Sequence, residues 1–273
     1  MHDQANDLRN LVRHCVPPPA LPGARRPGLI AVAGGKGGVG TTTLAVHLAM
    51  ALDRRQLRTV LIAAAAGGDA ATLCGVEPRD TVADVLAGRR TVTEAIQSGP
   101  GTLGILPGLW GAAATTEMTP LAIDRLFAQV AALGDSTDMV VYDAGNSPSR
   151  LADRCWQVAD LLLLTMTAET PAVMESYAAI KRLAARARTA PIHVVVNMTT
   201  NEQAADEAYG RLAGACRRFL AVELTPAAPF PWQRRATQRA ASRPMDRLLD
   251  TLLSAVDHGK QSRLEAKELQ DVA

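Results

Sequence analysis

A glycine-rich segment in the first fifth of the chain holds the residues best suited to chemistry. Residues 34–40 are GGKGGVG, and three threonines follow them. Glycines let successive backbone N–H groups converge on an anion, and a helix that starts directly afterwards adds its dipole. Lys36 could supply a cation, and the Thr42 hydroxyl could bind a metal ion. The segment therefore predicts a phosphate-binding loop.

Two nucleotide-binding patterns compete for this loop. The spacing G-x-G-x-x-G from Gly35 to Gly40 fits a dinucleotide site, which also requires an acid about 20 residues later, at the end of the second strand. That strand ends in four alanines, residues 63–66, so the requirement fails. The P-loop pattern G-x-x-x-x-G-K-[ST] fits the same glycines and Thr42, although Thr41 replaces its lysine. The P-loop is the better interpretation.

Apolar runs and amphipathic segments alternate along the chain, and they must position this loop. Continuous apolar runs typical of buried strands occupy 29–33, 58–65, 103–106, 138–143, 160–166 and 192–197. Helical patterns occupy 41–54, 80–87, 91–97, 120–132, 170–187 and 201–217. Fully apolar strands alternating with helices predict a doubly wound, mostly parallel α/β sheet.

The two ends of the chain differ from this pattern. Residues 3–14 predict a short amphipathic helix, and residues 15–28, with five prolines, predict an extended linker. We expect the folded domain to span 29–257 and a polar tail to span 258–273. The helix predicted at 245–256 has one apolar stripe, which indicates docking onto the sheet; the alternative is weak membrane contact.

Composition excludes several classes of protein. Lys and Arg total 29 against 27 Asp and Glu, and aromatic residues make up only 3%, so the chain has neither the charge nor the stacking surface of a nucleic-acid-binding protein. The four cysteines are far apart, which argues against a zinc site or a disulfide framework. The polar N-terminus is no signal peptide, and no apolar run approaches a membrane span. We therefore expect a cytoplasmic protein.

The loop sequence KGGVGTTT resembles the deviant P-loop of the MinD/ParA ATPases, in the SIMIBI class of P-loop NTPases. DMVVYD (138–143) resembles their Walker B strand, 159–183 resembles the segment that follows it, and VVVN ends at Asn197. The resemblance implies ATP and Mg²⁺ as cofactors and a sandwich homodimer in which Lys36 reaches the partner's phosphates. It also implies that Thr42 and Asp143 bind the metal and that Asn197 contacts adenine. The implied nucleotide-binding residues are Gly35, Lys36, Gly37, Gly38, Val39, Gly40, Thr41, Thr42, Thr43 and Asn197.

Three further segments resemble the FlhG (FleN, YlxH) regulators of flagellar number. These are TVADVLAGRRTVTEAI (81–96), CRRFLAVEL (216–224) and DQANDLR (3–9), which fits the family's DQAxxLR element. In that family the element binds the GTPase FlhF and stimulates its GTP hydrolysis. The resemblance implies that Gln4 is the active residue, that the neighbouring positions fix the helix on FlhF, and that the protein works in the cytoplasm or at the inner face of the membrane. The partner-binding set is Asp3, Gln4, Ala5, Leu8 and Arg9.

The chain departs from the family where hydrolysis is concerned. Thr41 stands in place of the P-loop lysine, and Ala63 and Ala65 stand in place of two switch I aspartates. Lys36 and Asp143 remain as candidates for a catalytic role. Because water positioning and a phosphate-binding cation are both missing, we expect an ATPase fold that hydrolyses ATP very slowly or not at all. The alternatives are an active MinD-type ATPase that cycles between dimer and monomer, and an adaptor like those of pilus or cellulose-synthase operons.

Overall fold

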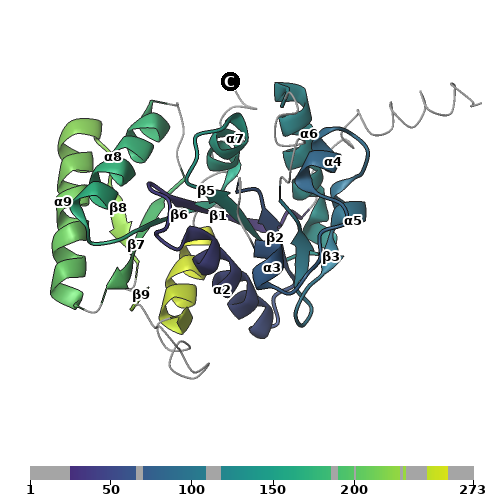
Figure 1. Cartoon of the computed structure of the whole chain (residues 1–273), viewed down its shortest axis with the longest axis horizontal. Coiled ribbons are helices and arrows are strands. Elements are labelled where there is room, and N and C mark those ends of the chain that lie inside the picture. The colour runs from purple at the N-terminus through teal and green to yellow at the C-terminus, as the bar shows by residue number, and fades with distance from the viewer. Residues whose placement is uncertain are drawn as a thin grey trace, which may run out of the picture.

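The centre of the molecule is a nine-stranded sheet (Figure 1). The computed structural model describes residues 25–65, 70–108, 118–185, 190–199, 201–227, 230–231 and 245–257. The strand order is β3-β4-β2-β5-β1-β6-β7-β8, and β9 pairs with β7. Of the pairs between described strands, only β3–β4 is antiparallel. The strands are β1 (Gly28–Gly34), β2 (Thr59–Ala63), β3 (Gln97–Ser98), β4 (Gly104–Leu106), β5 (Met139–Gly145), β6 (Leu161–Met166), β7 (Ile192–Thr199), β8 (Leu224–Pro226) and β9 (Phe230–Pro231).

Five of the described helices begin at a Thr, Ser or Asn residue that can cap the first turn. Thr119, Ser149 and Asn201 cap three helices by accepting a hydrogen bond from a backbone N–H of the first turn. Thr81 and Thr91 begin two short helices with capping boxes. The helices are α2 (Thr41–Arg54), α3 (Ala70–Leu73), α4 (Val82–Leu86), α5 (Val92–Ala95), α6 (Pro120–Ala131), the 3-10 turn η2 (Ala132–Asp135), α7 (Arg150–Val158), α8 (Thr170–Ala184), α9 (Glu202–Leu220) and a last helix over 245–257.

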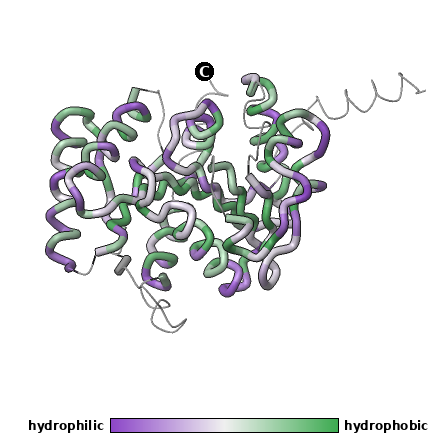
Figure 2. The backbone as a smooth tube through the Cα atoms, viewed as in Figure 1, coloured by the Kyte–Doolittle hydropathy of each residue, from purple (hydrophilic) through white to green (hydrophobic). Residues whose placement is uncertain are grey.

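Helices cover both faces of the sheet and bury two separate cores. One core joins the sheet to α4–α9, and the other joins it to α2, α3 and the last helix. Figure 2 shows hydrophobic residues along the strands and hydrophilic ones on the outward faces of the helices. The chain winds away from β1 in both directions, toward β5 and β2 on one side and β6 and β7 on the other. A topological switch point, where such sheets bind ligands, therefore lies at the carboxyl end of β1.

The last helix, drawn in yellow beside α2 in Figure 1, docks by its apolar stripe. Leu248, Leu249 and Leu252 are completely buried, and Arg55, directly after α2, forms ion pairs with Asp246 and Asp250. The docking interpretation is therefore correct for this structure. In this structure the apolar stripe lies inside the second core, so it is not available for contact with a membrane.

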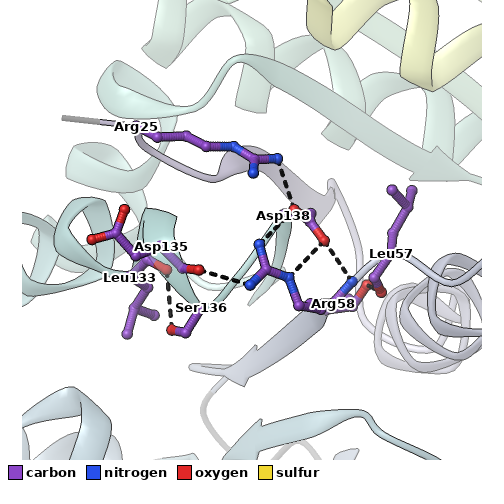
Figure 3. Close-up of polar contacts among 8 residues, drawn as sticks. Arg25, Leu57, Arg58, Leu133, Asp135, Ser136 and Asp138 are labelled. Carbon is purple, nitrogen blue, oxygen red and sulfur yellow. Dashed lines mark hydrogen bonds and ion pairs between the residues drawn. The ribbon is translucent and has the colours of Figure 1, made fainter. Parts of the chain in front are cut away.

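A cluster of ion pairs fixes the chain where it enters the sheet (Figure 3). Asp138, directly before β5, accepts hydrogen bonds from Arg25 at 2.7 Å and from Arg58 at 2.9 and 3.0 Å. Arg26 pairs at 2.8 Å with the buried Asp160, directly before β6. These contacts place residues 25 and 26 against the domain, and Gly28 is already part of β1. The expected linker over 15–28 is thus too long at its C-terminal end.

The expected order of strands and helices agrees with the structure, with local differences. β2 ends at Ala63 instead of residue 65, and β5 continues to Gly145. The helices α3 and α7 and the short strands β3, β8 and β9 were not expected, although Ser149 is a good cap for α7. The helix predicted over 3–14 and the tail 258–273 lie outside the described residues. None of the described helices is long and apolar enough to cross a membrane.

Candidate phosphate-binding site

The loop between β1 and α2 has the conformation that the glycines predict. Gly38 and Gly40 have φ of 78° and 85°, which is left-handed backbone that L residues rarely adopt. Gly37 and Gly38 are exposed, whereas Val39 is buried and anchors the loop. The Gly40 carbonyl accepts the N–H of Leu44 at 2.9 Å, so α2 starts directly from the loop. Backbone N–H groups and a helix N-terminus are therefore presented together at the carboxyl end of β1.

The helix α8 packs closely against this loop. A Cβ at Gly35 would lie 2.4 Å from the backbone nitrogen of Ser176 in α8, so only glycine allows this approach. The Ser176 hydroxyl is buried without a hydrogen-bond partner among the described residues. Sequence reasoning missed Ser176 because nothing in a helical pattern marks a contact with a distant loop.

The cationic part of the site is weaker than in an ordinary P-loop. Thr41 is buried, and its hydroxyl oxygen occupies the space that a Cβ at Gly34 would need. Lys36 is the loop's one cation, and its Nζ lies 3.7 Å from the Glu169 carboxylate at the start of α8. Sequence reasoning also missed Glu169. Its position before a helix is the only signal that could have revealed it.

Asp143 lies at the end of β5, beside β1, and its side chain is completely inaccessible to solvent. Burial raises the pKa of its carboxyl group, and the nearby Thr42 hydroxyl and the Gly145 N–H oppose that rise. One carboxylate oxygen accepts the Gly145 N–H at 3.1 Å; the other, Oδ2, has no hydrogen-bond partner among the described residues. A buried carboxylate oxygen without a partner, beside a threonine hydroxyl, is a fitting donor set for Mg²⁺ carried by phosphates.

Two alanines, at positions where the family resemblance implies switch I acids, lie beside this carboxylate. Ala63 of β2 is the register partner of Asp143, and Ala65 is also buried. A Cβ at Gly145 would come within 2.8 Å of the Ala65 side chain, so the two backbones pack closely here. The apolar surroundings explain why burial dominates the pKa of Asp143. The described residues contain no group of three or more His, Cys, Asp or Glu that could hold a metal ion.

Asn197, at the end of β7, contacts the loop itself. Its side-chain nitrogen donates a 2.9 Å hydrogen bond to the Val39 carbonyl. Thr42 is half-buried beside Asp143, and Thr43 is exposed on the next position of α2. The structure thus brings together the predicted residues of the loop, Asp143 and Asn197. Asp3, Gln4, Ala5, Leu8 and Arg9 lie outside the described residues.

The fold and this site define a class of protein. Residues 30–223 match the CobQ/CobB/MinD/ParA nucleotide binding domain, and the chain belongs to that family. The cell division ATPase MinD of Pyrococcus furiosus has the same fold, with a TM-score of 0.65 and 19% identity over 83% of this chain and 98% of that one. MinD of Pyrococcus horikoshii, solved with Mg-ADP, gives a TM-score of 0.66 at 17% identity over 82% of this chain and 95% of that one.

Within the family, the chain is similar to flagellar regulators. It is 30% identical over 215 residues to the antiactivator FleN of Pseudomonas aeruginosa, and the matched region covers 77% of each chain. It is 25% identical over 183 residues to the flagellum site-determining protein YlxH of Helicobacter pylori, and the matched region covers 66% of this chain and 62% of that one. The resemblance to the FlhG group is confirmed at this level: the chain is a FleN-like member of the family.

Proposed function

We propose that this chain is a cytoplasmic MinD/ParA-type regulator of flagellar number or placement that binds ATP with Mg²⁺ and hydrolyses it very slowly. The similarity to FleN supports the regulatory role. The observation that carries the catalytic part is the buried Asp143 with Ala63 as its register neighbour, where the family has an acid. The site keeps groups that hold phosphate and lacks groups that activate water.

The residues present account for binding. The loop N–H groups and the N-terminus of α2 would bind the phosphates, with Lys36 as the cation. Thr42 and Asp143 would hold Mg²⁺, which neutralises charge on the phosphates. Without a lysine at position 41, one charge-assisted hydrogen bond is lost, which costs about 1.5–3 kcal/mol. The site also lacks the two switch I carboxylates that would orient an attacking water, which costs several orders of magnitude in rate.

The regulatory output, in this proposal, comes from residues 3–14. Gln4 acts on the GTP site of FlhF, and Asp3, Ala5, Leu8 and Arg9 hold the helix on its partner. Arg25 and Arg26 fasten the start of the described chain to the amino edge of the sheet, opposite the phosphate loop. The ATPase-like domain then serves as a scaffold or as a switch that does not cycle.

The experiment compares the full chain with its Gln4→Ala and Asn6→Ala variants. Asn6 occupies a variable position of the DQAxxLR element, so its variant is the matched control. We expect the native chain and Asn6→Ala to accelerate GTP hydrolysis by FlhF, and Gln4→Ala to lose most of the acceleration. Equal GTP turnover with and without the native chain would reject the mechanism and favour an adaptor of the pilus or cellulose-synthase type.

A second candidate is an active ATPase that cycles between dimer and monomer, and the retained Lys36 favours it. In that case Lys36 would leave Glu169 and reach the phosphates of a second copy. Single-turnover measurement of ATP hydrolysis, with the oligomeric state followed by light scattering, separates the two functions. Turnover together with ATP-dependent dimers supports the cycling enzyme.

A further inference from the structure

Asn197 makes two hydrogen bonds that fix its side-chain amide. Its nitrogen donates to the Val39 carbonyl at 2.9 Å, and its oxygen accepts the N–H of Met198 at 2.9 Å. The reversed amide would set nitrogen against an N–H and oxygen against a carbonyl, so the orientation is unique. A carboxylate could satisfy Met198 but could not donate to Val39. Only a side-chain amide satisfies both groups.

The backbone on both sides is shaped around this contact. Met198 has a φ of 56°, an uncommon conformation for a residue other than glycine, and the β7–β9 register shifts between Asn197 and Thr199. On the loop side, a Cβ at Gly40 would lie 2.5 Å from the Asn197 nitrogen. A strained residue and an obligatory glycine at one contact indicate that the contact itself has a function.

The hydrogen bond sets the orientation of one peptide unit in the phosphate loop. The carbonyl of Val39 and the N–H of Gly40 belong to the same planar, trans peptide and point in opposite directions. Because Asn197 holds the carbonyl, the Gly40 N–H points away from the amide. Gly40 directly precedes α2, where an N–H donor reinforces the helix N-terminus as an anion site.

We propose that Asn197 is a positioning residue for phosphate binding: its amide orients the Val39–Gly40 peptide and so orders the loop. The inference rests on the proposed nucleotide binding. It differs from the adenine contact that the family resemblance implies for Asn197, because a base contact affects only ligands that have a base. An ordering role affects every polyphosphate.

The test uses the full chain with two probes, ATP and inorganic tripolyphosphate, each with Mg²⁺, in calorimetric titrations. The variant is Asn197→Ala. Asn201→Ala is the matched control, because it also removes a side-chain hydrogen bond, from the Gln203 N–H, that does not involve the loop. We expect Asn197→Ala to weaken both probes about equally, by about tenfold, and Asn201→Ala to weaken neither.

Amide hydrogen exchange of the ligand-free protein gives an independent measurement. We expect residues 35–43 to exchange faster in Asn197→Ala and at the native rate in Asn201→Ala. If ATP binds more weakly but tripolyphosphate and the exchange rates are unchanged, Asn197 is a base contact and the proposal is wrong. If the native chain binds neither probe, the proposed nucleotide binding is wrong. If, in addition, residues 35–43 exchange at the same rate in Asn197→Ala as in the native chain, the ordering role of Asn197 is wrong as well.

Discussion

Individual residues of the phosphate loop are constrained in different ways. Gly38 and Gly40 both have positive φ, but a Cβ at Gly38 would meet nothing within 4 Å, whereas one at Gly40 would collide with Asn197. The first glycine is therefore required by the backbone alone. The second is required by the backbone and by the side chain of Asn197, 157 positions later in the chain.

This difference gives a prediction at the scale of one residue. Gly38→Ala should lower the free energy of unfolding by about 1–2 kcal/mol, the usual cost of a left-handed L residue. Gly40→Ala should lower it further and should also weaken phosphate binding by at least about tenfold, because the Cβ must displace the Asn197 amide. Urea denaturation and tripolyphosphate titration measure the two effects. Equal losses of stability in both variants would contradict the close contact.

At the scale of elements, the helix over 245–257 completes the second core. It covers the sheet beside α2, and its end reaches the start of β1, where a Cβ at Gly28 would lie 2.8 Å from Val256. The apolar stripe is therefore committed to the interior. A membrane could compete for it only after the helix had left the sheet.

We expect Leu252→Ala to destabilise the protein by about 2–5 kcal/mol, the range for truncating a fully buried leucine. Thr251→Ala, next to it on the exposed side of the helix, should change stability by less than about 0.5 kcal/mol. Thermal unfolding of both variants measures the difference. Similar stabilities of the two variants would show that the helix does not belong to the core.

At the scale of the whole molecule, the carboxyl and amino ends of the parallel strands carry different groups. The carboxyl edge presents the phosphate loop, Asp143 and Asn197, and the amino edge binds Arg25 and Arg26 of the incoming chain. The Arg58 side chain and backbone lower the pKa of the Asp138 carboxyl to about 2, against an ordinary value of 3.8. The ionised form of Asp138 thus holds β2, β5 and the residues before β1 together.

The pH dependence follows from the direction of this shift. Because the folded pKa lies below the unfolded one, Asp138 contributes stability that is fully present above about pH 4 and is lost as the pH falls through 2. Asp138→Asn should lower the free energy of unfolding by about 1–2 kcal/mol at neutral pH, and the gap to the native protein should close between pH 4 and 2. Asp135→Asn is the control, because Asp135 binds Arg58 through its backbone carbonyl, which the substitution keeps. A gap that persists at pH 2 would exclude the ionic contribution.

Local patterns were sufficient to predict most of the fold. The helix of 14 residues at Thr41–Arg54 was predicted to the residue, because glycines precede it and its apolar spacing is regular. α7 was missed, because its nine residues bury only Leu151, Ala152, Cys155 and Trp156. Lys36, Asp143 and Asn197 could be singled out because family motifs mark them. Glu169 and Ser176 could not, since their roles arise only when α8 lies against the loop.

The sequence by itself predicted the order of the main strands and helices, the phosphate loop, and Thr41, Ala63 and Ala65 at positions where the family resemblance implies a lysine and two acids. These depend on residue type and short-range spacing, which act within one or two turns of chain. Only the tertiary structure decided that Asn197 holds the Val39 carbonyl, that Lys36 pairs with Glu169, and that the last helix is buried. Each of these joins residues far apart in the chain, and the packing of the sheet, not the local sequence, brings such residues within hydrogen-bonding or van der Waals distance.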